Sequence, residues 1–457
     1  MIEQPANTSP DATRHANAAL RTPLTRRRWL AATATATAAA ALARATTRAL
    51  QATPHAATPT PSQPWRGQQW VGSWARGMHV PHRGTGDDSA NQIFALEGTT
   101  LRQIVRFSTG GEQVRIRLSN IAGDGQIFIG AASVALRDHD AVIDPATLRR
   151  VTFSGLPEAT IPAHAIILSD PVDLPVANLA ELAISLSFPA ETTSSTVHGE
   201  AFQTNYLSSA GDQTMVTDFP VESTMQSWVF LTGVDVQVME PRGAIVCLGD
   251  SITDGVNSTP DTNHRWPDLL ADRLAAAGAA MPGVLNLGIA GNRVLRDAPD
   301  GYANLGPGAL ARFDRDVVAQ PGASHVIVLL GINDIALPGY TGFADEDVTA
   351  EQLIAGLRQV AERAHEHGLV AYGATITPYG DSDFYTPQGE AIRTAVNDWI
   401  RQGGAFDAVI DFDAVVRDPA QPSRHLPAYD GGDFLHFNDT GFQAMAGSID
   451  LSLFGVS

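Results

Sequence analysis

Three residues suited to nucleophilic catalysis stand near the two ends of the C-terminal half of the chain. Ser251 ends a Gly-Asp-Ser triplet that follows a short apolar run, residues 244–248, and Asp433 and His436 lie near the C-terminus. A serine hydroxyl is a poor nucleophile without a base, a group that orients the base, and donors for the oxyanion. The residues after Ser251 must therefore supply all three.

Asp433 and His436 are three residues apart. In one turn of helix-like backbone this spacing places both side chains on the same side. A carboxylate can then bond one imidazole nitrogen, fix the tautomer and leave the other nitrogen facing the serine. A D-x-x-H pair is common by chance, but this one follows the serine turn and closes the C-terminal region.

The oxyanion needs hydrogen-bond donors, and three are candidates. They are the backbone N–H of Ser251, the backbone N–H of Gly291, where glycine lets the backbone approach the substrate, and the side-chain amide of Asn333. Taken alone, Asn333 also fits a turn residue that bonds its own backbone. The position of each candidate just after an apolar strand favours the catalytic interpretation.

The elements that must position these residues alternate between strand and helix after Gly243. Because the carboxyl ends of parallel strands meet at one edge of the sheet, the loops that hold the candidate residues should converge there. Such alternation predicts a doubly wound, mainly parallel α/β sheet. The expected strands are 244–248, 284–287, 325–330, 369–375 and 408–411, and the expected helices are 267–277, 309–318, 349–367, 387–402 and 438–453.

The preceding region, residues 65–240, has a period of two instead. Val114, Ile116 and Leu118 alternate with polar residues, runs near residues 182–186 and 234–238 do the same, and Gly, Pro and Asp clusters separate the runs. This pattern predicts an antiparallel, jelly-roll-like β-sandwich. Its aromatic residues are interpreted as core, although a sugar-stacking platform stays open as an alternative for Trp70, Trp74, Phe94 and Tyr206.

The N-terminal residues 1–57 have the pattern of a secretion signal and linker. A basic cluster at residues 26–28 precedes Trp-Leu and an Ala/Thr-rich run, an order typical of exported proteins and not of a membrane span. The paired arginines resemble a twin-arginine signal. We therefore expect a secreted protein, with a disordered basic tail as the alternative.

Composition excludes several function classes. The 457 residues carry a net charge of −19, which argues against nucleic acid and anionic membranes as partners. The absence of lysine excludes Schiff-base enzymes, Ser–Lys dyads and P-loop nucleotide sites. The single cysteine, Cys247, excludes an intramolecular disulfide and is interpreted as a small core residue.

Four separated motifs together resemble the SGNH (GDSL-type) hydrolases. They are the Gly-Asp-Ser triplet that ends at Ser251, then Gly291, Asn333 and the pair Asp433 and His436. The resemblance covers residues 242–457 and implies a flavodoxin-like three-layer αβα fold that hydrolyses carboxylic esters and thioesters without a metal or organic cofactor. It implies Ser251 as nucleophile, His436 as general base and acid, and Asp433 as orienting carboxylate, with an oxyanion hole at Ser251, Gly291 and Asn333. Asp254 and Asp334 could lie near this site, and we interpret both as structural residues that bond loop backbone.

The surrounding sequence is similar to secreted bacterial members of the family, many of which deacetylate polysaccharides, and a β-sandwich precedes this domain in some carbohydrate esterases. We therefore expect a serine esterase for short acyl groups, acetyl foremost, on a small-molecule or polysaccharide substrate. A lipase or lysophospholipase is the first alternative. A glycan-binding protein with a silent hydrolase domain is an alternative from another class. The G-x-S-x-G of α/β-hydrolases and the G-x-G-x-x-G of dinucleotide-binding domains are absent from the expected positions.

Overall fold

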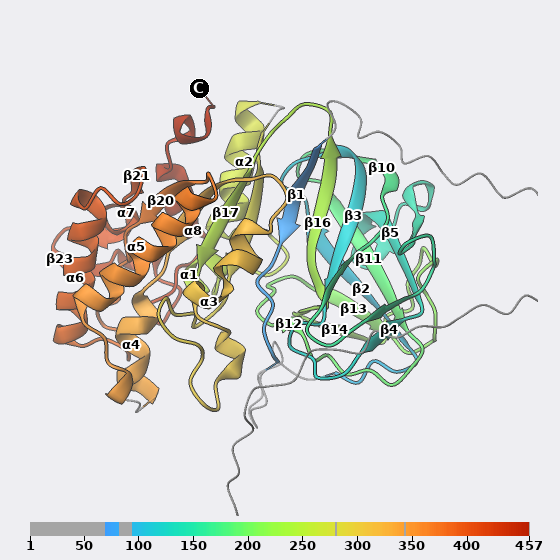
Figure 1. The fold of residues 1–457 in the computed structure, drawn as a ribbon, viewed down its shortest axis with the longest axis horizontal. Coiled ribbons are helices and arrows are strands. Elements are labelled where there is room, and N and C mark those ends of the chain that lie inside the picture. The colour runs from blue at the N-terminus through green and yellow to red at the C-terminus, as the bar shows by residue number, and fades with distance from the viewer. Residues whose placement is uncertain (1–68, 82–93, 279–280, 342–343, 457) are drawn as a thin grey trace, which may run out of the picture. The chain divides into compact units, whose positions relative to one another are not determined.

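The computed structural model describes residues 69–81, 94–278, 281–341 and 344–456 (Figure 1). The predicted secretion signal and linker lie outside these residues. The described chain has an all-β region followed by an α/β region, as predicted. All described residues belong to one compact unit, so a division into two domains near residue 241 stays a prediction.

The β region contains two large antiparallel sheets. The first has five strands in the order β1-β16-β3-β10, with β9 paired to β3, and the second has seven in the order β14-β13-β2-β11-β5-β6, with β7 paired to β5. Two short pairs, β4-β8 and β12-β15, complete it. The strands are β1 (Gln69–Ala75), β2 (Thr99–Arg106), β3 (Gly111–Ser119), β4 (Ile127–Ile129), β5 (Ala131–His139), β6 (Val142–Ile143), β7 (Arg149–Val151), β8 (Ala159–Ile161), β9 (Ile166–Leu168), β10 (Val172–Val176), β11 (Glu181–Phe188), β12 (Val197–His198), β13 (Asn205–Ser208), β14 (Ser223–Met225), β15 (Trp228–Val229) and β16 (Leu231–Val238).

The predicted alternation places the core of the β region correctly. Val114, Ile116 and Leu118 are fully buried in β3 and share one hydrophobic cluster with the apolar residues of β11 in the other sheet. Trp74 is buried in this cluster and Tyr206 in a separate one, which confirms the core interpretation for both aromatics. These two side chains therefore do not form a shared surface for sugars.

The outer face of the seven-stranded sheet is also covered, which a period of two does not predict. Ala183 and Ser185 in β11 are buried although they alternate with the core residues. A following loop packs over them: Arg102 donates to the Val216 carbonyl at 2.6 Å, and Phe219 joins the smaller cluster. A loop far along the chain thus covers positions that the local pattern assigns to solvent.

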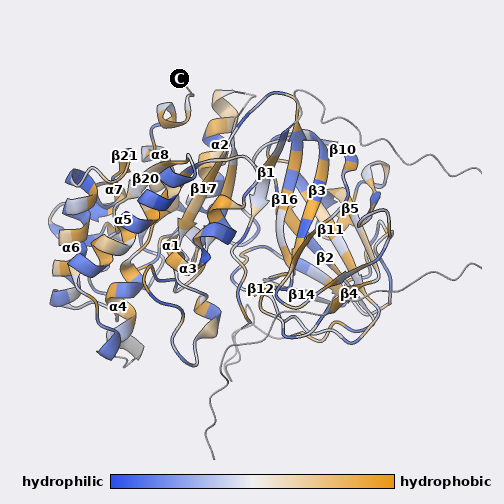
Figure 2. Cartoon of the chain, in the orientation of Figure 1, coloured by the Kyte–Doolittle hydropathy of each residue, from blue (hydrophilic) through white to orange (hydrophobic). Residues whose placement is uncertain are grey.

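The α/β region has one parallel sheet in the order β18-β17-β19-β20-β21, a flavodoxin-like order. Its strand β17, which pairs with β18 and β19, is buried and apolar along its length (Figure 2). Helices α2, α7 and α8 contact one another, and α3, α4, α5 and α6 form a second group, consistent with two helical layers. The elements are β17 (Ala244–Gly249), β18 (Gly283–Gly288), β19 (Ala323–Leu329), β20 (Val370–Ala374), β21 (Ala408–Ile410), the hairpin β22 (Arg417–Asp418) and β23 (Gln421–His425), α1 (Ser251–Asp254), α2 (Trp266–Ala277), α3 (Ala309–Phe313), α4 (Ile332–Thr341), α5 (Ala350–Glu366), α6 (Pro387–Gln402), α7 (Phe412–Val416), α8 (Asp439–Ser448), the π-helical turn η4 (Asp314–Val318) and the 3₁₀ turns η2 (Pro145–Thr147), η3 (Ala303–Leu305), η5 (Ala344–Glu346), η6 (Pro427–Tyr429) and η7 (Leu451–Phe454).

Two predicted boundaries are wrong in ways that matter for the site. Asn333, expected in a loop, lies in the first turn of α4, a helix that contains Pro338 and whose proline and glycine content obscured it. The helix expected over 438–453 ends at Ser448. None of the helices in the described part of the chain is long and apolar enough to cross a membrane.

Candidate active site

The nucleophile candidate sits where β17 ends. Ser251 is the first residue of the one-turn helix α1, and the carboxylate of Asp250 caps this turn by accepting a hydrogen bond from the Ile252 N–H at 3.0 Å. Ser251 is 5% exposed. Burial raises the pKa of Asp250 to about 7. The sheet therefore delivers a hydroxyl to its carboxyl edge on a capped, rigid turn.

The three candidate residues form a continuous hydrogen-bonded chain. The Nε2 atom of His436 lies 2.8 Å from the Oγ atom of Ser251, and its Nδ1 atom lies 2.6 Å from Oδ2 of Asp433. An ionised carboxylate can only accept, so Asp433 favours the tautomer with the proton on Nδ1. This tautomer leaves Nε2 as an acceptor for the serine proton.

The backbone that joins Asp433 to His436 is not the helix-like turn that the spacing suggested. Phe434 between them has φ of 58°, in the left-handed region. The other carboxylate oxygen, Oδ1 of Asp433, accepts from the N–H groups of Leu435 and His436 at 3.0 and 2.8 Å. The carboxylate itself therefore shapes the turn that brings the two side chains together.

The electrostatics of the pair keep Asp433 ionised. Burial alone would raise its pKa, but the hydrogen bond and charge of His436 and the two backbone N–H groups outweigh burial and hold the pKa well below its usual range. The amide of Asn257 also points to Asp433, 3.4 Å from Oδ2. A permanent negative charge beside the imidazole stabilises the imidazolium that forms when the serine proton is taken.

The three oxyanion-donor candidates follow the ends of three neighbouring strands: Ser251 begins α1, Gly291 lies in the loop after β18, and Asn333 lies in the first turn of α4. Gly291 has φ of 73°, a conformation that strains other residues, and a Cβ atom there would approach the side chain of Leu305 to 2.4 Å, so that Leu305 would have to move. Asn333 is 7% exposed, and its Nδ2 atom donates to the carbonyl of Asn292 at 3.1 Å. Asn333 thus bonds the neighbouring loop and not its own backbone, and one amide proton is left for another acceptor.

The sequence did not point to Arg312, a buried residue that bonds the ends of two strands and the loop after Gly291. Arg312 is 1% exposed, and its guanidinium donates to the carbonyls of Gly249 (2.9 Å) and Leu287 (2.7 Å). It also donates to Oδ1 of Asn292 at 3.0 Å and pairs with Asp316 at 2.9 Å. The spacing of four between Arg312 and Asp316 signals a helical ion pair, but nothing local points to the strand ends.

Replacing Arg312 with Met should lower the free energy of unfolding by about 3–5 kcal/mol, because the carbonyls of Gly249 and Leu287 and the amide oxygen of Asn292 lose a charged donor. Arg315 is a matched control, because it also bonds Asp316 but contacts none of the strand-end carbonyls named above. Denaturant unfolding should give a smaller loss for Arg315→Met. Equal losses for the two variants would mean that Arg312 matters only as a partner of Asp316.

Asp334 has the structural role that the sequence predicted, and Asp254 does not. Asp334 accepts from the N–H groups of Val294 and Leu295 at 2.8 and 3.0 Å and so holds the loop after Gly291. Burial raises its pKa to about 6. Asp254 bonds His198 of the β region instead of loop backbone. No cluster of metal-ligating side chains occurs among the described residues.

A comparison with models of protein families gives one match, which lies in the α/β region. Residues 247–444 match the model of the GDSL-like lipase/acylhydrolase family, so the α/β region is an acylhydrolase domain that acts on ester bonds. No curated protein matched the chain.

A search of solved structures found similarity over slightly less than half of this chain. An aryl esterase from M. smegmatis has 15% identity and a TM-score of 0.37, covering 47% of this chain and 100% of its own. An acetyl xylan esterase has 18% identity and a TM-score of 0.34, covering 45% and 96%. A carbohydrate acetylesterase from Sinorhizobium meliloti has 15% identity and a TM-score of 0.37, covering 47% and 100%.

Proposed function

We propose, from the match of residues 247–444 to the GDSL-like lipase/acylhydrolase family, that this chain is a serine esterase that removes short acyl groups, acetyl foremost. The observation that carries the proposal is the unbroken contact from Asp433 through His436 to Ser251, at 2.6 and 2.8 Å. A binding domain without catalytic activity would not require Asp433, His436 and Ser251 to be aligned in this way.

The chemistry follows from the positions of the three groups. His436 takes the proton of Ser251 at Nε2 while the serine oxygen attacks the ester carbonyl carbon. The N–H groups of Ser251 and Gly291 and the free amide proton of Asn333 receive the negative oxygen. The imidazolium then gives its proton to the departing alcohol. Water, activated by the same imidazole, releases the acid and restores Ser251.

Polysaccharide is the proposed source of the alcohol. Phe434 is 46% exposed and lies two residues from His436, in a left-handed conformation that costs free energy in a non-glycine residue. An exposed aromatic ring next to the base offers a surface on which a sugar ring can stack.

A substrate panel tests the function directly. Purified protein is assayed with p-nitrophenyl esters of increasing chain length, acetylated xylan and a lysophospholipid, before and after treatment with a serine-directed phosphonate. The proposal expects turnover that is highest for acetyl and lost after the phosphonate. A preference for long chains or the lysophospholipid would favour a lipase, and no turnover on any ester would favour a binding protein.

The pH profile is expected to identify the base. Only neutral His436 can accept the serine proton, so kcat/KM should rise as the pH is raised from acid to neutral. Asp433 titrates far below this range, but Asp250, with its pKa raised to about 7 by burial, titrates within it. The control is Asp250→Asn, which still caps α1 but has no proton to lose. The rise should persist in this variant, and a flat profile in either protein would contradict the role of His436.

We further propose that the protein is exported through the twin-arginine route. The proposal rests on the order of basic cluster, apolar run and polar linker in residues 1–57. Replacing Arg27 and Arg28 with Lys should retain the full-length protein inside the expressing cell. Unchanged export would contradict this route.

A further inference from the structure

The segment that carries the nucleophile is held by the β region. Asp254, the last residue of α1, accepts a hydrogen bond at Oδ1 from Nε2 of His198 in β12, at 2.8 Å. Both side chains are almost completely buried, at 0% and 2% exposure. The contact joins residues 56 positions apart and reaches the turn of Ser251 from outside the acylhydrolase match, residues 247–444.

His198 is bonded at both ring nitrogens. Its Nδ1 atom lies 2.9 Å from the carbonyl of Gly77, so an acceptor oxygen faces each of the two ring nitrogens. The neighbouring His79 has the opposite role. Burial and the nearby His198 lower the pKa of His79 to about 4, and its neutral Nε2 accepts from the Gly199 N–H at 3.1 Å. The ring of His198 is therefore held at both nitrogens, and the next residue, Gly199, is held by His79.

The turn that His198 holds cannot be rigid on its own. A helix of one turn is unstable without external contacts, and α1 spans only Ser251–Asp254. Its end is held by the His198 bond and by Asn286, whose Nδ2 donates to the Thr253 carbonyl at 2.7 Å. The Gly255 N–H in turn donates to the Ser251 carbonyl at 2.9 Å. A shift at Asp254 would therefore be transmitted to Ser251.

The loop that follows α1 connects the β region with the orienting carboxylate, Asp433. Asp261 accepts from the Thr204 N–H and from the amide of Gln203 in the β region, both at 2.6 Å. From the same loop, Asn257 reaches Asp433 and the Thr259 N–H donates to Asp439 at 2.9 Å. One loop thus contacts both the β region and the segment that carries the orienting carboxylate of Asp433.

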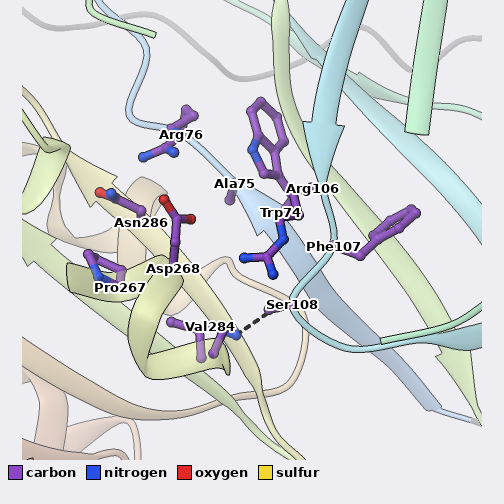
Figure 3. Close-up of a pocket in the computed structure, with 11 residues that line it drawn as sticks. Trp74, Ala75, Arg76, Arg106, Phe107, Ser108, Pro267, Asp268, Val284 and Asn286 are labelled. Atoms are coloured by element: carbon purple, nitrogen blue, oxygen red, sulfur yellow. Dashed lines mark hydrogen bonds between the residues drawn. The ribbon is translucent and has the colours of Figure 1, made fainter. Parts of the chain in front are cut away.

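Two other contacts across the two regions lie away from α1. Ser108 accepts from the Val284 N–H at 2.8 Å and so covers the free edge of β18, beside a small pocket lined by Arg76, Asp268 and Asn286 (Figure 3). Arg106 pairs with Asp272 of α2 at 2.5 Å. Arg106 and Ser108 lie in the same interface, and within the described residues no hydrogen bond or ion pair joins either side chain to α1. The Arg106–Asp272 ion pair is therefore a suitable control.

We propose that the β region is a working part of the active site, in which His198 is a positioning residue that acts through Asp254 on the turn of Ser251. This inference rests on the proposed esterase function. It gives the β region a role in catalysis that requires no glycan binding.

The matched pair His198→Gln and His198→Asn tests the proposal. The longer amide of Gln can place its NH₂ near the position of Nε2 and keep the bond to Asp254, whereas that of Asn reaches only the position of Nδ1. We expect His198→Asn to lower kcat on p-nitrophenyl acetate, and the rate of phosphonate labelling, by about 10²-fold, because small misplacement of a reacting group costs that much. KM should change less than threefold, and His198→Gln should recover most of the loss.

Controls separate the possible outcomes. Asp272→Ala breaks the interface ion pair away from α1 and should leave both rates unchanged. Equal rates in His198→Asn, His198→Gln and the wild type would overturn the proposal, as would equal losses in Asp272→Ala and His198→Asn. If the histidine variants do not fold, Asp254→Asn, which can donate to a neutral His198, should be faster than Asp254→Ala, and equal rates would overturn the proposal. A wild type that neither turns over esters nor reacts with the phosphonate would refute the proposed function as well.

Discussion

Replacing Ser251 with alanine is expected to lower kcat/KM for p-nitrophenyl acetate by about 10⁴-fold. Ser251 is the only hydroxyl with which Nε2 of His436 forms a hydrogen bond within the described residues. Without it the enzyme forms no acyl-serine, and only the oxyanion donors and substrate binding can still accelerate attack by water. The residual rate should therefore stay above the uncatalysed rate but far below that of the wild type.

Ser258→Ala is the matched control for this variant. Ser258 is also buried, at 3% exposure, and lies seven residues further along the same segment. Both variants should unfold at nearly the wild-type temperature, and only Ser251→Ala should lose activity and phosphonate labelling. Retention of more than a tenth of the wild-type rate by Ser251→Ala would remove it as the nucleophile.

The convergence of the site could be predicted because it depends on strand direction more than on side-chain detail. Apolar runs such as residues 244–248 and 325–330 identify buried parallel strands, and parallel strands place their following loops at one edge. Ser251, Gly291 and Asn333 needed only to follow such strands to be brought together. Asn333 was placed correctly at this edge although its element was assigned wrongly.

The supports of the site could not be predicted in the same way. Arg312 and His198 act across 63 and 56 residues of sequence, on backbone carbonyls and on a carboxylate that carry no local signal. For Asp254, the sequence predicts a bond to loop backbone. Its actual partner lies in the other region, and only the packing of the two regions reveals it.

Replacing Asn333 with alanine is expected to lower kcat by about 10²–10³-fold with little change in KM. The amide of Asn333 is held by the Asn292 carbonyl at 3.1 Å, so its remaining proton is directed before substrate arrives. A donor fixed in this way is worth most when negative charge develops on the carbonyl oxygen, and little in the ground state. The loss should therefore appear in kcat, measured at saturating p-nitrophenyl acetate.

Asn333→Asp is the companion variant, because it has nearly the same shape but no amide donor. If donation matters, Asn333→Asp should be at least as slow as Asn333→Ala, whereas a packing role would leave it close to the wild type. A loss below about threefold in Asn333→Ala would exclude this residue from the oxyanion hole. Phosphonate labelling distinguishes loss of the nucleophile from loss of an oxyanion donor. Ser251→Ala cannot be labelled at all. Asn333→Ala keeps its nucleophile and should be labelled slowly but to completion.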